Sequence, residues 1–204
     1  MDRTPVKSPK KDGVLSPVSV VQKLDIKSPS SPISSCHLRT AKDNVVQLNK
    51  LFHDWKQLNT KSLVLIKSIF QIKSKSLDTE TSCVDELESI FLNGEEVIAG
   101  YENIVCSMNM INKKFEALTK LCDPQELLFV TSTALQVENL VSKIVQGYEK
   151  ELATKKLVYE NIAHAKSLSK LTMYAAAWEY EVYLESVSVD VLRLNMETNL
   201  PVNT

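Results

Sequence analysis

The distribution of proline is the sequence feature that most constrains this fold. Five of the seven prolines lie within the first 32 residues, and each of those five follows a Ser or a Thr. From Ile33 to Asp123 the chain contains no proline. Proline inside a helix removes a hydrogen bond and clashes with the preceding turn. The proline-free stretch can therefore form long helices, whereas the first 32 residues cannot.

Residues 1–39 are predicted to form a disordered, basic tail. They are rich in Ser, Pro and Lys, and the first aromatic residue of the chain is Phe52. Such a segment cannot bury enough apolar surface to offset the entropy lost on ordering. Its seven basic and three acidic residues give a charge of about +4, whereas the remaining 17 basic and 22 acidic residues give about −5. A basic tail on an acidic body indicates a regulated or anchoring arm.

The tail carries five candidate phosphorylation sites. Thr4 and Ser8 each fit the full Ser/Thr-Pro-x-Lys/Arg preference of cyclin-dependent kinases, and Ser16, Ser28 and Ser31 fit the minimal Ser-Pro form. Phosphorylation of two sites changes the charge by about −3 to −4, which would cancel the positive charge of the tail. We therefore expect the tail to be phosphorylated.

A second interpretation of the tail is weak DNA contact. Ser8-Pro9-Lys10-Lys11 is a short basic motif, and Lys side chains bind DNA phosphates without reading the sequence. One copy of the motif would bind weakly. The nearly neutral composition, with a pI of about 6.3, is also not typical of a dedicated nucleic-acid domain.

The rest of the chain is predicted to be an elongated, antiparallel, all-α bundle or coiled coil. Apolar residues recur at helical spacing, and no strand-rich region interrupts them, except that Val187, Val189 and Val191 alternate with polar residues as a strand would. Each apolar stripe must be buried against another helix or a partner. We expect one domain over 40–198, with helices at about 40–75, 80–121, 132–165 and 170–196.

The first predicted helix shows how broad the apolar faces are. A companion stripe of leucine and isoleucine flanks the main one, which fits a helix buried in a bundle rather than a narrow seam. Asn59 and Ser62 interrupt the main stripe. Its apolar members are Val45, Leu48, Phe52, Trp55, Ile66 and Ile69.

Helix start signals and one glycine define the middle of the chain. Ser82 with Asp85, and Thr133 with Gln136, each match the spacing of a capping box. A turn and a short extended segment are expected before Thr133. Gly94 lies on the apolar stripe of the second helix, where it permits close helix approach at a cost of about 1 kcal/mol of helix propensity.

Several large side chains are candidate anchors, either of the core or of a protein interface. Trp55 and Trp178 are the two tryptophans of the chain, and each lies on an apolar stripe. Buried tryptophan contributes to cores and to interface hot spots alike, so both interpretations stay open. The fourth helix presents Leu171, Ala175, Trp178 and Val182 on its face. The further anchor candidates are Phe52, Tyr148, Leu152, Tyr174 and Tyr183.

No catalytic, metal-binding or cofactor-binding site is predicted. The four glycines are isolated, which excludes a glycine-rich phosphate loop. His53 and Asp54 are adjacent on a helix and therefore point in different directions. The four cysteines have no zinc-like spacing and read as reduced thiols. No apolar run approaches the ~20 residues that span a bilayer, so we expect a non-enzymatic protein with neither a membrane span nor a small-molecule substrate.

Three segments together resemble the cyclin-dependent kinase 2-interacting protein family. Their order and internal spacing match the family pattern over about half of the chain, in the first, third and fourth helices. The second helix and the long tail depart from that pattern. The matching residues are Lys42-Asp43-Asn44, Leu51, Trp55 and Leu58-Asn59, then Tyr148, Lys150-Glu151-Leu152, Lys155 and Ala163-His164, and finally Tyr174, Trp178, Tyr183 and Glu185-Ser186.

The resemblance implies a nuclear adaptor in DNA replication, checkpoint signalling and genome maintenance. The implied partners are a cyclin-dependent kinase, a Cdc7-type kinase, the partner of a checkpoint kinase, and the subunits of an AAA+ ATPase complex that also supports ribosome maturation. Two alternatives stay open. One is a coiled-coil subunit of a kinetochore or spindle complex, and the other is a chromatin protein that binds DNA through its basic tail.

Overall fold

The computed structural model describes residues 35–79 and 84–198, and these residues form five α-helices. The first two helices are the longest, with 45 and 38 residues. The predicted all-α class is confirmed. In chain order the helices are α1 (Ser35–Thr79), α2 (Val84–Leu121), α3 (Ala134–Ile162), α4 (Leu168–Glu179) and α5 (Val182–Thr198).

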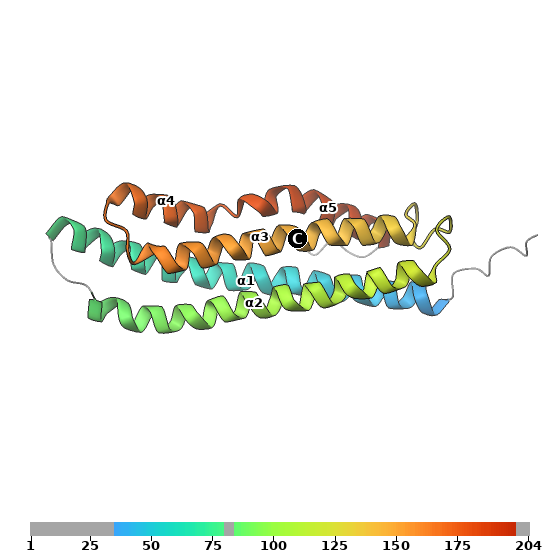
Figure 1. Ribbon diagram of the computed structural model, residues 1–204, viewed down its shortest axis with the longest axis horizontal. Helices are drawn as coiled ribbons and strands as arrows, with labels where there is room; N and C mark the ends of the chain where they lie inside the picture. The colour runs from blue at the N-terminus through green and yellow to red at the C-terminus, as the bar shows by residue number, and fades with distance from the viewer. Residues whose placement is uncertain (1–34, 80–83, 199–204) are drawn as a thin grey trace, which may run out of the picture. The chain divides into compact units, whose positions relative to one another are not determined.

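Helices α4 and α5 follow one another along the same side of the bundle, so that together they take the place of one long helix (Figure 1). Helix α2 packs against α1 and α3, and α4 and α5 close the bundle on the other side. Contacts between α2 and α3 show the antiparallel direction. Asn109 of α2 donates to Glu149 of α3, and Glu102, earlier on α2, forms an ion pair with Lys156, later on α3.

The predicted apolar stripes form the core. On α1, Val45, Leu48, Trp55 and Ile66 are buried, and Phe52 is half-buried. The flanking stripe of α1 is half-buried and packs around this core. The same pattern continues on α2 and α3. The broad apolar faces therefore serve mainly to bury the helices against each other.

The start of α3 is the clearest match between a local signal and the structure. Thr133 is the N-cap residue, and its hydroxyl accepts from the backbone N–H of Gln136. The side chain of Gln136 in turn accepts from the backbone N–H of Thr133, which completes the capping box. An isolated antiparallel bridge joins Leu127 to Thr133, as the expected extended segment before the helix suggests.

Glycine lets α3 approach its neighbours closely at two positions. A Cβ atom at Gly94 of α2 would lie 2.3 Å from Cε2 of Tyr159, whose hydroxyl donates to the carbonyl of Phe91 at 2.5 Å. A Cβ atom at Gly147 of α3 would lie 2.3 Å from Cγ2 of Val187 on α5. A larger residue at either position would have to displace the neighbouring side chain. The close approach expected at Gly94 is therefore present.

The sequence predicted one helix over 170–196, but the structure has two helices there, α4 and α5. Helix α4 ends at Glu179, and α5 begins at Val182 after a residue with left-handed backbone geometry, Glu181, at φ 35°. The break turns Val182 out of the expected face, so that it is exposed. The stretch with alternating valines is helical, so the strand-like pattern there did not produce a strand.

The tail and one start signal lie outside the described residues. They are residues 1–34 of the tail that the sequence predicted to be disordered, the five phosphorylation candidates, Ser82 and Cys83. The remaining residues of that predicted tail, 35–39, belong instead to α1, because helical hydrogen bonding continues to Ser35. Within residues 35–79 and 84–198, no helix is both long and apolar enough to cross a membrane.

Candidate functional site

A buried lysine lies at the centre of the bundle. Lys155 of α3 has no solvent-exposed surface. Its Nζ donates to Oδ1 of Asn59 at 2.9 Å and to the carbonyl of Trp178 at 3.1 Å, and it lies 3.3 Å from Oε1 of Glu181. These partners come from α1, α4 and the break between α4 and α5. One ammonium group therefore joins three parts of the fold.

Three aromatic rings surround the same ammonium group. Its Nζ lies 4.9 Å from the ring centre of Trp178, 5.3 Å from that of Tyr101 and 5.9 Å from that of Trp55. An aromatic face attracts a cation electrostatically, and more strongly when the cation is shielded from water. The aromatic cage replaces part of the hydration that Lys155 loses on burial.

Two polar residues on the α1 stripe complete the cluster. The hydroxyl of Ser62 accepts from Nε1 of Trp178 at 3.0 Å and lies 2.9 Å from the hydroxyl of Tyr101. Tyr101 also donates to Oδ1 of Asn59 at 3.1 Å. Asn59 and Ser62 interrupt the apolar stripe because they bind the polar edges of these large side chains.

Glu181 supplies the negative charge of the cluster. Its Oε1 accepts from Nε1 of Trp55 at 2.8 Å and also faces Lys155. Left-handed geometry at a non-glycine residue costs on the order of 1–3 kcal/mol and persists where surrounding contacts hold it. The interactions with Trp55 and Lys155 are such contacts. They explain why the chain breaks at Glu181.

A second buried carboxylate, Glu151, lies one turn before Lys155 on α3. Its Oε2 accepts from the backbone N–H of Tyr183 at 3.4 Å, at the start of α5, whereas Oε1 is buried without a hydrogen-bond partner among the described residues. Burial raises the pKa of Glu151, and the nearby Lys155 opposes that rise. Burial also lowers the pKa of Lys155, against the attraction of Glu181 and Glu151.

The raised pKa of Glu151 gives a pH prediction. The native state holds this proton at a pH where the unfolded chain has released it, so the group contributes stability at low pH. That contribution is lost as pH rises through the folded pKa. Glu151→Gln removes the buried charge and is expected to raise the free energy of unfolding near pH 7, with the gain shrinking towards pH 5. Urea denaturation at several pH values measures this.

Glu160→Gln, an exposed carboxylate on the same helix, is the matched control. It should leave the free energy of unfolding nearly unchanged across the range. Two results would contradict a raised pKa of Glu151. One is a lower free energy of unfolding for E151Q than for the wild type at pH 7. The other is a difference in free energy of unfolding between E151Q and the wild type that does not change with pH.

We call the polar and aromatic groups around Lys155 the Lys155 cluster. Chemically, it can hold helices in register, because its charged and polar groups are engaged with one another and are mostly buried, with Asn59 and Glu181 partly exposed. No group of three or more His, Cys, Asp or Glu side chains with metal-binding geometry occurs in the part of the chain that the structure describes. The members of the Lys155 cluster are Trp55, Asn59, Ser62, Tyr101, Lys155, Trp178 and Glu181.

The structure brings together some of the predicted anchors and separates others. Trp55 and Trp178 are both in the Lys155 cluster. Phe52 stacks on Tyr148 with ring centres 5.4 Å apart, directly beside Trp55. Leu152 and Tyr174 are half-buried and pack against the core, and Tyr183 is exposed on α5.

Sequence reasoning missed Ser62, Tyr101 and Glu181 as members of one site. Polar residues inside an apolar stripe were the available signal for Asn59 and Ser62. Lys155 entered only through the family resemblance. Glu181 had no signal in sequence, because its role depends on the break between two helices.

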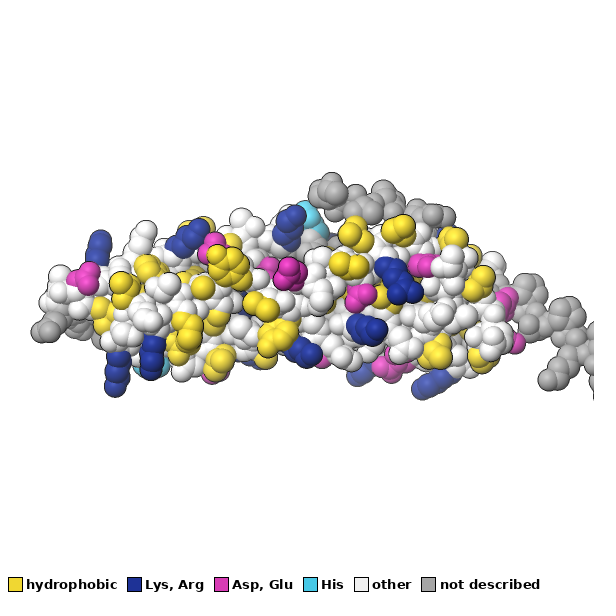
Figure 2. Space-filling model, turned by 90° about the horizontal axis from the view of Figure 1, so that it is seen from above, with side chains coloured by type: hydrophobic (Ala, Val, Ile, Leu, Met, Phe, Trp, Pro, Cys, Tyr) yellow, Lys and Arg dark blue, Asp and Glu magenta, His cyan; other side chains and the backbone are white. Residues whose placement is uncertain are grey.

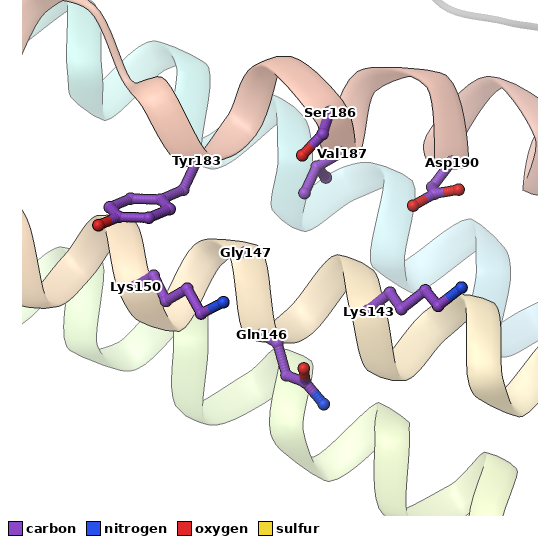
Figure 3. Close-up of a pocket in the computed structure, with 8 residues that line it drawn as sticks. All are labelled: Lys143, Gln146, Gly147, Lys150, Tyr183, Ser186, Val187 and Asp190. Atoms are coloured by element: carbon purple, nitrogen blue, oxygen red, sulfur yellow. The ribbon is translucent and has the colours of Figure 1, made fainter.

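An open groove between α3 and α5 has a volume of about 250 Å³. Figure 3 shows basic side chains of α3 on one side and side chains of α5 on the other. Nζ of Lys150 lies 6.0 Å from the ring centre of Tyr183. The close contact at Gly147 keeps the groove shallow, so it is a seam between helices rather than an enclosed chamber. Its other lining residues include Lys143, Gln146, Ser186 and Asp190.

Apolar side chains also remain on the outer face of α4 and α5. Figure 2 looks onto this face and shows yellow side chains along its length, interspersed with charged ones. Larger exposed apolar areas mark sites where proteins bind. On α4 and at its end the exposed apolar residues are Leu168, Met173 and Tyr180.

The fold and the site together define a helical bundle whose polar chemistry is internal and whose outer face is partly apolar. No protein-family model matches the chain. It is similar to proteins named cyclin-dependent kinase 2-interacting protein. The human protein is 23% identical over 199 aligned residues, which cover 85% of this chain and 92% of the relative. The Xenopus laevis protein is 22% identical over 183 residues, which cover 78% and 87%.

The mouse protein of the same name is 23% identical over 203 residues, covering 87% of this chain and 94% of the relative. The similarity therefore extends far beyond the three segments that first indicated it. The predicted resemblance is confirmed: over most of its length this chain is similar to proteins named cyclin-dependent kinase 2-interacting protein.

Proposed function

We propose that this chain is a non-enzymatic adaptor that binds a cyclin-dependent kinase. The observation that carries the proposal is the similarity to cyclin-dependent kinase 2-interacting proteins over most of both chains. The segments that first showed the resemblance also contribute Trp55, Asn59, Lys155 and Trp178 to the Lys155 cluster. A shared bundle architecture is the simplest physical reason for this coincidence.

The polar groups of the core are paired with one another, and apolar side chains are exposed on the surface; this arrangement supports an adaptor. The Lys155 cluster is satisfied within the chain, so a protein partner would bind to the outside of the bundle. Met173 and Tyr180 are 55% and 73% exposed on the α4 side. Exposed aromatic and methionine side chains are enriched in protein interfaces. We place the kinase contact on the exposed face of α4.

The finer functional picture rests on the family resemblance. It comprises a nuclear location and a role in DNA replication, checkpoint signalling and genome maintenance, extending to ribosome maturation. The further partners are a Cdc7-type kinase, the partner of a checkpoint kinase and the subunits of an AAA+ ATPase complex. Affinity purification from dividing cells followed by mass spectrometry tests this picture. Recovery of spindle or kinetochore proteins in place of these partners would count against it.

Direct binding tests the kinase proposal. The full chain, immobilised, should bind a purified cyclin-dependent kinase 2–cyclin complex with a dissociation constant in the micromolar range or below. Met173→Glu places a charge on the α4 face and should weaken binding at least tenfold. The control, Leu92→Glu, changes an equally exposed apolar residue on α2 and should have no effect.

The same kinase should phosphorylate Thr4 and Ser8, which mass spectrometry of the reaction product would identify. The absence of wild-type binding, with and without the cyclin, would overturn the proposal. An equal loss of binding in M173E and L92E would remove the assignment of the α4 face.

A further inference from the structure

Helix α5 has two apolar faces. The inner face packs on α3 and α1 and includes Val187 and Leu194, both buried. The outer face carries Val182, Val189, Leu192 and Met196, which are 66%, 67%, 48% and 73% exposed. A helix that only closed a bundle would need one apolar stripe. The second stripe therefore requires a separate explanation.

The outer stripe has the spacing of a helix–helix interface. Val182, Glu185, Val189, Leu192 and Met196 follow one another at intervals of three, four, three and four residues. This alternation is the spacing by which one helix packs against another along its length. The complementary surface is therefore a helix.

The charges on this face identify which helix fits. Glu185 and Arg193 lie four residues before and four residues after Val189, and both are exposed. Val182 and Met196 lie seven residues before and after it. An antiparallel second copy of this helix, related by a two-fold axis at Val189, therefore places Val189 opposite Val189 and Val182 opposite Met196, whereas Leu192 lies opposite Ser186. It also places Glu185 opposite Arg193.

We propose that α5 is a homodimer interface, in which the α5 helices of two copies pack antiparallel across a two-fold axis at Val189. Val189 contacts the partner's Val189. Val182 packs against the partner's Met196, and Glu185 forms an ion pair with the partner's Arg193. The Val189 contact lies on the two-fold axis and occurs once, and the axis repeats each of the other two contacts, as in any isologous interface.

The rest of the fold makes α5 a firm platform for such a contact. Val187 is wedged against the backbone of α3 at Gly147, and Asn195 accepts from Nδ2 of Asn49 on α1 at 2.7 Å. Little ordering is then needed on association, which favours binding. One helix per copy gives an interface at the small end of the specific class, about 1,200 Å² in total. We expect a dissociation constant on the order of micromolar.

Sedimentation equilibrium of the full chain between about 1 and 200 µM tests the dimer. The apparent mass should rise from 22.9 kDa towards twice that value with concentration. Val189→Glu, which places two like charges at the axis, should give a monomer throughout the range. Leu92→Glu on α2 is the matched control and should associate as the wild type does. Circular dichroism confirms that each variant is folded.

A charge exchange separates this arrangement from nonspecific association. Glu185→Arg alone and Arg193→Glu alone each create like-charge pairs and should weaken the dimer at least tenfold. The double variant E185R/R193E restores both ion pairs with reversed sign and should recover most of the affinity. A wild-type chain that stays monomeric at 200 µM overturns the proposal. So does a double variant that remains as weak as the single ones.

Discussion

Trp178→Ala is expected to lower the free energy of unfolding by about 3–5 kcal/mol. Trp178 is fully buried, and its ring packs edge-on against Tyr101 with ring centres 6.3 Å apart. Truncation leaves a cavity, removes the donor that Ser62 accepts from, and removes the closest aromatic ring from Lys155. Urea denaturation followed by far-ultraviolet circular dichroism measures the loss.

Trp178→Phe is the matched variant. It fills much of the volume but lacks the Nε1 donor, so we expect a smaller loss than for W178A. Equal denaturation midpoints for W178A and the wild type would show that the indole does not support the bundle. Equal losses in W178A and W178F would show that the hydrogen bond to Ser62, rather than the packed volume, carries the effect.

Lys155→Met should cost about 3 kcal/mol, because it removes the fully buried member of an ion pair and leaves Glu181, whose side chain is 23% exposed, without its cation. Methionine retains most of the apolar stem of lysine, so the loss reports mainly on the ammonium group. Asn59 keeps its bond from Tyr101, but Glu181 keeps only the donor Nε1 of Trp55. Chemical denaturation near pH 7 provides the measurement.

The double variant K155M/E181Q separates charge from packing. A neutral amide at position 181 still accepts from Trp55 but no longer buries an unpaired charge. We expect it to recover about 1–3 kcal/mol of the loss in K155M. A wild-type stability in K155M would contradict the arrangement of the Lys155 cluster. An additive, larger loss in the double variant would contradict the role given to Glu181.

The helices were predictable because local rules govern them. The proline-free interval, the stripe through Val45, Leu48 and Trp55, and the capping box at Thr133 each act over a few residues. Such signals establish that a helix exists and which face it buries. The same kind of signal predicted the close approach at Gly94, because a glycine on an apolar stripe leaves room for a neighbouring helix.

The Lys155 cluster was only partly predictable. Trp55 and Trp178 stood out by their size and their place on apolar stripes. Ser62 and Asn59 looked like defects in the stripe, because their partners, Tyr101 and Trp178, are distant in sequence. A polar residue on an apolar face identifies a need for a hydrogen-bond partner, but its spacing does not name that partner.

The amino-acid order alone thus specified an all-α chain with wide apolar faces, since helix formation and amphipathicity depend on near neighbours. Three-dimensional packing alone determined that Lys155 is buried, that the chain breaks at Glu181 between α4 and α5, and that α5 keeps an outward apolar stripe. A buried charge is tolerated only where carboxylate, carbonyl and aromatic groups from several helices converge on it. That convergence is a property of the assembled bundle, and no single segment contains it.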